Sequence, residues 1–252
     1  KIEVLPGATR YKYHGNWKLQ TENGVDGYHV PAVHANYIMT TRRRLTGESS
    51  NRNRVGIGDG SRGPTTSKGS GLGSGGSFSF AHGHQLIWGL VGSPEARASY
   101  RLIDWLRATH GDRRAWWING ATRNLLLYPN VFLMDTSTAL QIRMIRPISA
   151  TETEVTSYAI GPAGEPAEVR ETRIRQFEDF MNASGMATSD DLAEFNNCQI
   201  GFGGGGRFSD IARGADRWVR GPGPVGTELG IDALLSAEAY SDEGLFLALH
   251  ES

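Results

Sequence analysis

The chain has 252 residues, of which 38% are hydrophobic, and its formal net charge is -1. This length fits one large domain or two small ones and is enough for a core. The near-neutral charge gives no field that would attract nucleic acid or an anionic lipid surface. No run of about 18 apolar residues marks a membrane-spanning helix. The single cysteine, Cys198, excludes an internal disulfide, a cysteine-rich zinc site and an iron–sulfur cluster held by this chain's own thiolates, and it favours the reducing cytoplasm as the compartment.

The first third of the chain predicts a strand, a disturbed helix and a long loop. Residues 1–15 carry neighbouring aromatic and basic residues and indicate a strand. Residues 16–38 predict a helix from about Leu19 that is disturbed near Pro31, because proline interrupts helical hydrogen bonds. Residues 46–76 are rich in Gly, Ser, Thr and Asn, and so few apolar groups cannot offset the entropy of ordering. A flexible loop that is either a lid or disordered is expected there.

The middle of the chain predicts strands and one helix. Residues 77–91 alternate in polarity and predict a strand. Ser93 is a suitable cap for a helix that begins with Pro94 and Glu95 and ends at Gly111. Three further strands are predicted over residues 123–134, 139–147 and 153–160. Their short connections favour antiparallel pairing.

The last third predicts two helices and a closing strand. Residues 165–183 predict a helix that ends at Gly185. Ser189 is predicted to cap a second helix that starts with Asp190 and Asp191. A glycine loop at 203–206 and a last strand at 244–250 complete the predicted elements. Several strands with helices inserted late in the chain indicate the α+β class.

Asp26, His29 and His34 form the densest group of potential metal ligands. Two imidazoles and one carboxylate leave open positions on a divalent iron. On a regular helix the His-x4-His spacing points the two rings ~140° apart, so a break or a widened turn is needed. Asp26 lies one turn before His29, where it can accept a hydrogen bond from a ligand ring. The third ligand has to come from elsewhere, and Asp191 or Asp190 at the start of the late helix are the candidates.

Other histidines and the cysteine are weaker candidates. His82 and His84 would share one face of a strand, which also suits a metal, but they have no nearby carboxylate and are interpreted as packing or pocket residues. His110 precedes Gly111 and fits a charge at a helix C-terminus. Cys198 has no helix N-terminus or basic cluster around it, so a nucleophilic role is not expected.

The segment NWKLQTENGVDGYHVPAVHANY (16–37) resembles the mononuclear-iron signature of the α (large) subunits of Rieske-type aromatic ring-hydroxylating dioxygenases. It is most similar to the benzoate, toluate and anthranilate 1,2-dioxygenase branch. The similarity continues through RNLLLYPNVFLMD (123–135), QIRMIRPIS (141–149), RIRQFEDFMNASGMATSDDLAEF (173–195) and DEGLF (242–246). It therefore covers most of the chain outside the Gly-rich loop.

The resemblance implies a helix-grip fold (START/Bet v 1-like), in which an antiparallel sheet wraps around helices and a substrate cavity lies above the metal. The family holds its iron with two His and one Asp, which correspond to His29, His34 and Asp191, with Asp190 as the adjacent alternative. Asp26 corresponds to the aspartate that bridges electrons from the iron–sulfur cluster of a neighbouring subunit. The resemblance therefore implies a trimer, either a homotrimer or an α3β3 assembly with a small β subunit.

The family's Rieske domain needs Cys-x-His and Cys-x2-His pairs, and this chain has neither. Residues 1–252 are therefore expected to form the catalytic mononuclear Fe(II) domain alone, with the 2Fe-2S Rieske cluster supplied by a domain outside this chain. The implied activity is that of a non-haem iron oxidoreductase. Electrons from NADH pass through a reductase or ferredoxin and the Rieske cluster, and both atoms of O2 add to a benzoate-like aromatic acid to give a cis-dihydrodiol.

The substrate cavity is expected to be apolar with a few polar anchors. The substrate-binding residues predicted from the ligand segment, the family-like strand and the late helix are Asn23, Val30, Leu133 and Met181. An aromatic carboxylate needs a cation or an amide donor, and Arg143 and Gln141, on one face of a strand, are the candidates. For Arg143, a charge on the protein surface is the favoured interpretation.

Two other functions would use the same features. A non-catalytic helix-grip domain would bind an apolar ligand in this cavity without a metal. A Rieske-type monooxygenase or demethylase would keep the iron and form a different product. Metal analysis separates the first from the dioxygenase, and product analysis separates the second.

Overall fold

A computed structural model describes residues 1–46, 75–91, 94–136, 139–205, 214–242 and 249–250 of the chain. Its strands are β1 (Ile2–Val4), β2 (Thr9–Tyr13), β3 (Gly75–Ser79), β4 (Gln85–Leu90), β5 (Ala121–Leu127), β6 (Val131–Asp135), β7 (Leu140–Ser149), β8 (Glu152–Pro162), β9 (Val219–Arg220) and β10 (Leu235–Ala237). Its α-helices are α1 (Trp17–Asn23), α2 (Val30–Val33), α3 (Ala35–Thr46), α4 (Ile103–Gly120), α5 (Ala167–Phe180), α6 (Met186–Gly203) and α7 (Gly223–Leu229). Short 3-10 helices are η1 (Ala81–Gly83), η2 (Pro94–Ala96), η3 (Ala98–Leu102) and η4 (Ala215–Arg217).

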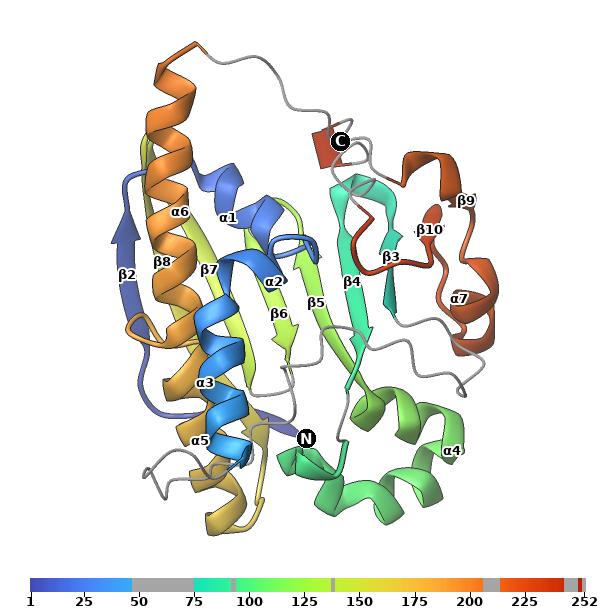
Figure 1. Ribbon diagram of the computed structural model, residues 1–252. Coiled ribbons are helices and arrows are strands. Elements are labelled where there is room, and N and C mark those ends of the chain that lie inside the picture. The colour runs from blue at the N-terminus through green and yellow to red at the C-terminus, as the bar shows by residue number, and fades with distance from the viewer. Residues whose placement is uncertain (47–74, 92–93, 137–138, 206–213, 243–248, 251–252) are drawn as a thin grey trace.

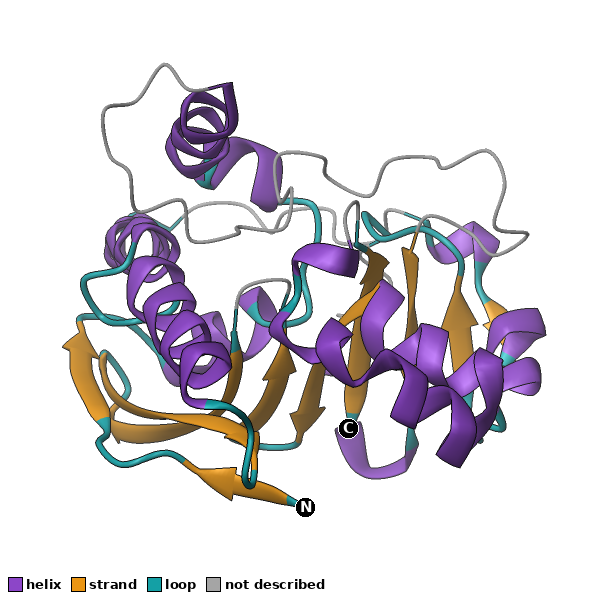
Figure 2. Cartoon of the chain, turned by 90° about the horizontal axis from the view of Figure 1, so that it is seen from below, coloured by secondary structure: helices purple, strands orange, loops and turns teal. Residues whose placement is uncertain are grey.

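The described strands form one antiparallel sheet in the order β1-β8-β7-β6-β5-β4-β3-β10-β9, with β2 also paired to β8. Helices α1, α3, α5 and α6 lie on one side of this sheet, in front of β6 to β8 (Figure 1). Seen from below, this part of the sheet curls beneath the long helices (Figure 2). A sheet wrapped around helices is the predicted α+β helix-grip arrangement, and the predicted fold class is confirmed.

The alternation along β7 decides which side chains face the helices. Gln141, Arg143 and Ile145 are buried on the inner face, whereas Met144 is exposed on the outer face. Neighbouring strands follow the same period of two, since Phe132 pairs with Arg143 and is also buried. The inner face of the sheet therefore mixes apolar and polar groups, and the polar ones have to be matched inside the protein.

Two predicted strands are hairpins instead. Residues 77–91 contain β3 and β4 with η1 between them, because His82 adopts a left-handed conformation (φ 62°) that ends the extended run. Residues 123–134 contain β5 and β6, joined through a turn with a cis Tyr128-Pro129 bond. Proline cannot donate to a strand ladder, so it belongs in the turn between two strands. The expected strand 153–160 is confirmed within β8.

Several predicted helix limits also differ. The helix predicted to end at Gly111 does break there, with φ 80°, but the chain is helical again as far as Gly120. Helix α6 begins at Met186, so Ser189 lies inside it and does not cap it; its hydroxyl donates to Gly185 O at 2.9 Å. The expected cap Ser93 lies outside the described residues.

The predicted segments near the gaps are tested only at their edges. Residue 46 ends α3 and residues 75–76 begin β3, and the rest of the predicted 46–76 loop lies outside the described residues. The same holds for most of the predicted strand 244–250, whose two described residues are helical. Along the parts of the chain that are described, no helix combines the length and apolar character needed to cross a membrane.

The main core lies between the sheet and α1. Phe132 and Leu126 are fully buried there with Val25. Gly24 ends α1 directly over Phe132, and a Cβ at this glycine would overlap the aromatic ring. The absent side chain therefore lets α1 lie flat on the sheet, which places the segment after α1 above the inner face.

Candidate metal centre

The two predicted histidine ligands lie on a helix that is interrupted twice. Helix α1 ends at Asn23, a turn follows, and His29 then precedes the short helix α2. His34 lies between α2 and α3 with non-helical angles (φ -96°, ψ 24°). The expected break near Pro31 is displaced: the proline lies in the first turn of α2, where its missing N–H costs nothing. The interruption brings the two imidazole centroids within 5.2 Å.

Asp26 organises the turn before His29. Its carboxylate accepts hydrogen bonds from the backbone N–H of Tyr28 at 2.6 Å and of His29 at 3.3 Å. It also accepts from His29 Nδ1 at 2.9 Å. This contact fixes the imidazole so that Nε2, the other ring nitrogen, is free to bind a metal.

The third side chain comes from the second turn of α6. Asp191 is buried, and its Oδ1 lies 3.3 Å from His34 Nε2 and 3.8 Å from His29 Nε2. Asp190 points elsewhere, with Oδ2 3.6 Å from His34 Nδ1. The geometry therefore favours Asp191 as the carboxylate ligand and places Asp190 behind the second imidazole.

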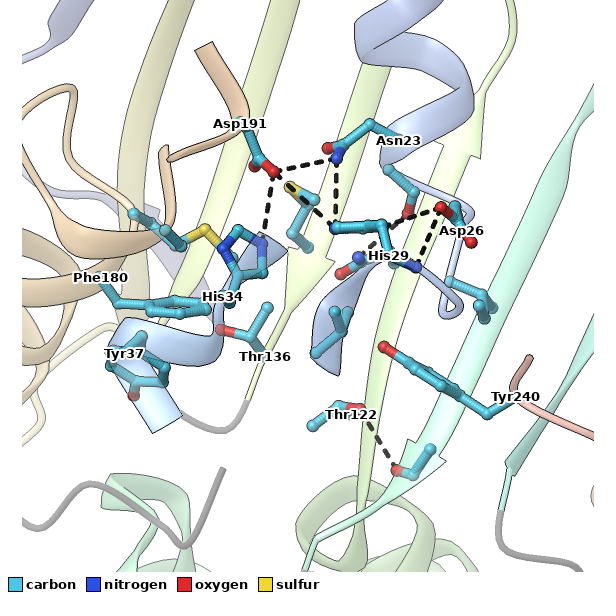
Figure 3. Close-up of a pocket in the computed structure, with 18 of the residues that line it drawn as sticks. Asn23, Asp26, His29, His34, Tyr37, Thr122, Thr136, Phe180, Asp191 and Tyr240 are labelled. Carbon is cyan, nitrogen blue, oxygen red and sulfur yellow. Dashed lines mark hydrogen bonds and ion pairs between the residues drawn. The ribbon is translucent and has the colours of Figure 1, made fainter. Parts of the chain in front are cut away.

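His29, His34 and Asp191 each offer one ligand atom, and these atoms lie within 4.8 Å of one another. They point toward one space from three directions (Figure 3). Asn23 Nδ2 donates to Asp191 Oδ1 at 3.1 Å and lies 3.2 Å from His29 Nε2. Its amide hydrogens put partial positive charge beside two of the ligand atoms, as a cation would. The donor set therefore fits a divalent ion of the iron type.

A cavity of about 160 Å³ borders the three ligand side chains. Three of the four predicted substrate-binding residues line it: Asn23, Val30 and Met181. Leu133 does not line it, and this prediction is wrong. The side chain of Leu133 is 38% exposed on the outer face, and strand alternation places Met134 on the cavity wall instead.

Arg143 also lines the cavity, against the expectation of a surface charge. It is 2% exposed, because α1, α5 and α6 cover the inner face of β7. Its Nη2 contacts Met181 Sδ at 3.6 Å, and its Nε has no hydrogen-bond partner. Within the described residues, no carboxylate oxygen lies within ion-pair distance of this guanidinium. Gln141 is buried beside it, with Nε2 3.4 Å from Met134 Sδ.

The family described as "Ring hydroxylating alpha subunit (catalytic domain)" matches residues 5–222. The chain belongs to this family. It is 46% identical over 250 residues to the toluate 1,2-dioxygenase subunit alpha of Pseudomonas putida and 45% identical over 251 residues to the 2-halobenzoate 1,2-dioxygenase large subunit of Burkholderia cepacia. Each alignment covers 99% of this chain and 52% of the relative, so the chain spans about half the length of these relatives.

Solved structures support the same fold for this ring-hydroxylating catalytic domain. A variant of naphthalene 1,2-dioxygenase bound to phenanthrene superposes with a TM-score of 0.70 at 19% identity, over 98% of this chain and 54% of that one. Naphthalene 1,2-dioxygenase from Rhodococcus sp. bound to indole gives 0.67 at 16% identity, over 99% and 56%. The helix-grip fold is thus shared beyond the similar sequences.

The electrostatics of the ring-hydroxylating catalytic domain centre on His34. Burial lowers the pKa of this imidazole, but hydrogen bonds and charge from Asp191 and then Asp190 raise it more, and the net pKa is raised. Two carboxylates on opposite sides of one ring thus favour positive charge at this place. A divalent cation would supply that charge while keeping the ring neutral.

The other candidates for chemistry lie away from the ligands. His82 and His84 are separated by the turn of η1 and do not share a strand face; His84 Nδ1 instead accepts from the backbone N–H of Tyr128 at 3.0 Å. His110 is exposed on α4, where it lies edge-on to Trp105. Cys198 has a raised pKa through partial burial and nearby glutamates, which disfavours a reactive thiolate.

Sequence reasoning missed part of the cavity wall. Thr122 and Asn124 line it from β5, and strand alternation would have indicated them once the hairpin was recognised. Tyr240 lines it from the segment after β10, and its hydroxyl points into the same space as the ligand side chains (Figure 3). No period or motif marks this tyrosine, because it lies outside any regular element.

Proposed function

We propose that this domain holds one Fe(II) on His29, His34 and Asp191. We further propose that it is the catalytic part of a ring-hydroxylating dioxygenase, which adds both atoms of O2 to a benzoate-like aromatic acid and yields a cis-dihydrodiol. The observation that carries this proposal is the convergence of these three side chains beside a cavity of about 160 Å³. Family membership and 41–46% identity to benzoate-type dioxygenase large subunits support it.

The residues around the candidate site are suited to ferrous iron. Two imidazoles and one carboxylate form the ligand set of non-haem iron oxygenases, in which open coordination positions remain for oxygen. Bound there, the iron would supply the O2-activating and electron-accepting chemistry that amino-acid side chains lack. Asp26 and Asp190 face the Nδ1 atoms of the two imidazoles, so each Nε2 is directed toward the centre.

The size of the cavity favours a single aromatic ring. An apolar cavity of roughly 150 Å³ is large enough to bind benzene, and this one is about 160 Å³. Val30, Met134 and Met181 would contact the faces and edges of the ring. Such walls exclude water from the reacting carbons and hold the ring beside the ligand side chains.

Arg143 is proposed as the anchor for the substrate carboxylate. A guanidinium in an apolar interior is costly unless an anion pairs with it. Arg143 lines the cavity without a carboxylate partner among the described residues, and its Nε is unpaired. A bound aromatic carboxylate would supply the missing anion, and its bidentate geometry matches the planar guanidinium.

Asp26 is proposed to link the candidate metal site to the electron donor. It fixes His29 directly, and its side chain is 17% exposed. Electrons are proposed to come from NADH through a reductase or ferredoxin and a 2Fe-2S Rieske cluster held by a domain other than residues 1–252. A homotrimer or an α3β3 assembly in the cytoplasm would bring such a cluster from a neighbouring subunit to this side of the site.

Iron content and product analysis test the proposal together. After anaerobic loading with Fe(II), we expect one iron per chain, with loss of iron in His29→Ala and His34→Ala. The exposed His82 is the matched control, and His82→Ala should keep its iron. With the complete electron-transfer system and isotopically labelled O2, benzoate should gain two labelled atoms. Failure to bind iron would support a non-catalytic binding domain, and one labelled atom a monooxygenase.

A further inference from the structure

Tyr240 forms the cavity wall at the opposite end from Arg143. The cavity floor runs along the inner face of the sheet from Arg143 on β7, past Met134 on β6, to Gly89 on β4. Tyr240 rests on Gly89, where a Cβ would lie 3.2 Å from the tyrosine ring. Strands are about 4.8 Å apart, so these two ends of the floor are roughly 14 Å apart at the backbone.

Three glycines from three segments make room for this tyrosine. Gly27 lies in the turn before His29, and a Cβ there would overlap both the carbonyl and the ring of Tyr240. Gly75 on β3 would place a Cβ 2.9 Å from the Cβ of Tyr240, and Gly89 closes the third side. A side chain at any of these positions would displace the ring. The tyrosine is therefore held in one place as a rigid part of the wall.

The Tyr240 hydroxyl is directed into the cavity (Figure 3). Within the described ranges, it has no hydrogen-bond partner. Burial and, to a smaller extent, the charge of Asp26 raise the pKa of Tyr240 to about 12. The hydroxyl therefore stays protonated at neutral pH and can donate a hydrogen bond.

We propose that Tyr240 is a specificity-determining residue, whose hydroxyl donates a hydrogen bond to a polar substituent on the edge of the aromatic ring that lies away from the carboxylate. This inference rests on the proposed function, with the carboxylate at Arg143 and the ring between the two ends of the cavity. A ring with a hydroxyl group at that edge gains a partner, whereas a ring with only hydrogen or methyl there leaves the tyrosine hydroxyl unpaired.

The test compares Tyr240→Phe with the unchanged protein on benzoate, 4-methylbenzoate and 4-hydroxybenzoate. Only one hydroxyl is removed, so the ring keeps its packing against Gly27, Gly75 and Gly89. For 4-hydroxybenzoate, we expect affinity measured by calorimetry and kcat/KM of the holoenzyme to fall by about 2- to 12-fold, the scale of one neutral hydrogen bond. For the other two acids, both quantities should stay the same or rise. Tyr158→Phe on the outer face of β8 is the matched control and should change neither.

A second variant changes the packing around the Tyr240 ring and keeps its hydroxyl. Gly89→Ala adds a methyl group 3.2 Å from the Tyr240 ring and should press it into the cavity. We expect weaker binding of both 4-substituted acids than of benzoate. Equal changes for all three acids in Tyr240→Phe would overturn the inference, since the residue would then be merely structural. If the unchanged iron-loaded holoenzyme turned over none of the acids, the proposed function itself would fail instead.

Discussion

Replacement of Arg143 by methionine should weaken substrate binding and leave the fold as stable as before, or more stable. Methionine keeps the length and apolar character of the arginine stem and removes the charge. Within the described residues, the guanidinium contacts Met181 Sδ at 3.6 Å, has an unpaired Nε and is 2% exposed. A buried charge in this state contributes little to folding, and replacing buried charges by apolar residues is often neutral or stabilising by about 1 to 4 kcal/mol.

Arg143→Met should weaken the binding of benzoate, although it leaves stability unchanged or raised. Hydrogen bonds to a charged group are worth about 1.5 to 3 kcal/mol, which corresponds to roughly a 10- to 150-fold increase in the Kd for benzoate. Calorimetric titration of the iron-loaded protein with benzoate measures this change. Benzamide, which has the same ring and no negative charge, should lose much less affinity. Thermal unfolding measures stability, and for a chain of this size each kcal/mol corresponds to about 2 to 4 °C in Tm.

The same strand offers a matched control. Arg146 is exposed on the outer side of β7 and pairs with Glu154 at 2.8 Å. An exposed ion pair contributes about 1 kcal/mol or less, so Arg146→Met should change neither Kd nor Tm appreciably. The reasoning would be refuted if Arg143→Met kept full affinity for benzoate, or if it lowered Tm by many degrees while the control did not.

Five other substitutions test the ligand assignment and the packing. Asp191→Ala should abolish stoichiometric iron binding, whereas Asp190→Ala, which removes only a partner of an imidazole, should reduce iron affinity by about 10- to 100-fold. Chelator competition distinguishes the two variants. Equal losses of iron affinity would contradict the assignment of Asp191 as the ligand. Asp26→Ala should also reduce iron affinity by about 10- to 100-fold and should slow single-turnover oxidation further. An unchanged rate of oxidation would argue against the proposed part of Asp26 in electron delivery. Gly24→Ala should destabilise the fold by about 1 to 3 kcal/mol, because the added methyl group would overpack against the Phe132 ring on β6. Gly201→Ala is the control: it lies in open space on α6 and should stabilise the fold slightly. Thermal unfolding measures both changes.

The long regular elements were predictable because local pattern and tertiary packing agree there. The alternation of Gln141, Arg143 and Ile145 with outward-facing neighbours is visible in the sequence, and it matches the burial along β7. Helix α5 lies within the predicted range 165–183 for the same reason. A period of two or 3.6 sustained over ten or more residues leaves few competing structures.

The errors fall where a turn divides an apolar run. The Tyr128-Pro129 turn lies inside a segment that is apolar on both sides, so periodicity alone joined β5 to β6. The same error placed Leu133 in the cavity. The alternation of residues along β6 does not show which alternate side chains face inward unless the register of the hairpin is known. The start of α6 was missed because Gly185, and not the serine at 189, occupies the cap position.

Some parts of the candidate site were predictable from the residues alone, and the choice between the two aspartates was not. The His-x4-His spacing showed that a regular helix could not bring the two rings together, and the interrupted segment from Asn23 to His34 agrees with that reasoning. Asp191 is far from these residues in the chain, and composition left it equivalent to Asp190. Only the family resemblance favoured Asp191. In the structure the two carboxylates differ in direction on α6, because Asp191 faces His34 Nε2 and Asp190 faces His34 Nδ1.

The distribution of unpaired polar atoms connects the fold to the proposed chemistry. Gln141, Arg143 and Ser157 are adjacent on the inner face of β7 and β8, they are buried, and each has a polar atom without a partner in the described structure. Burial of such groups is unfavourable for folding alone, because each costs about 1 to 3 kcal/mol when unpaired. Toward β4 to β6 the same face is mainly an apolar core built on Phe132 and Leu126. Gln85 on β4 is the buried polar exception beside Leu126, and its Oε1 is also unpaired in the described structure. The polar groups on β7 and β8 are therefore best explained by a ligand or ordered water that completes their hydrogen bonds. At the guanidinium of Arg143, that ligand would be an anionic substrate.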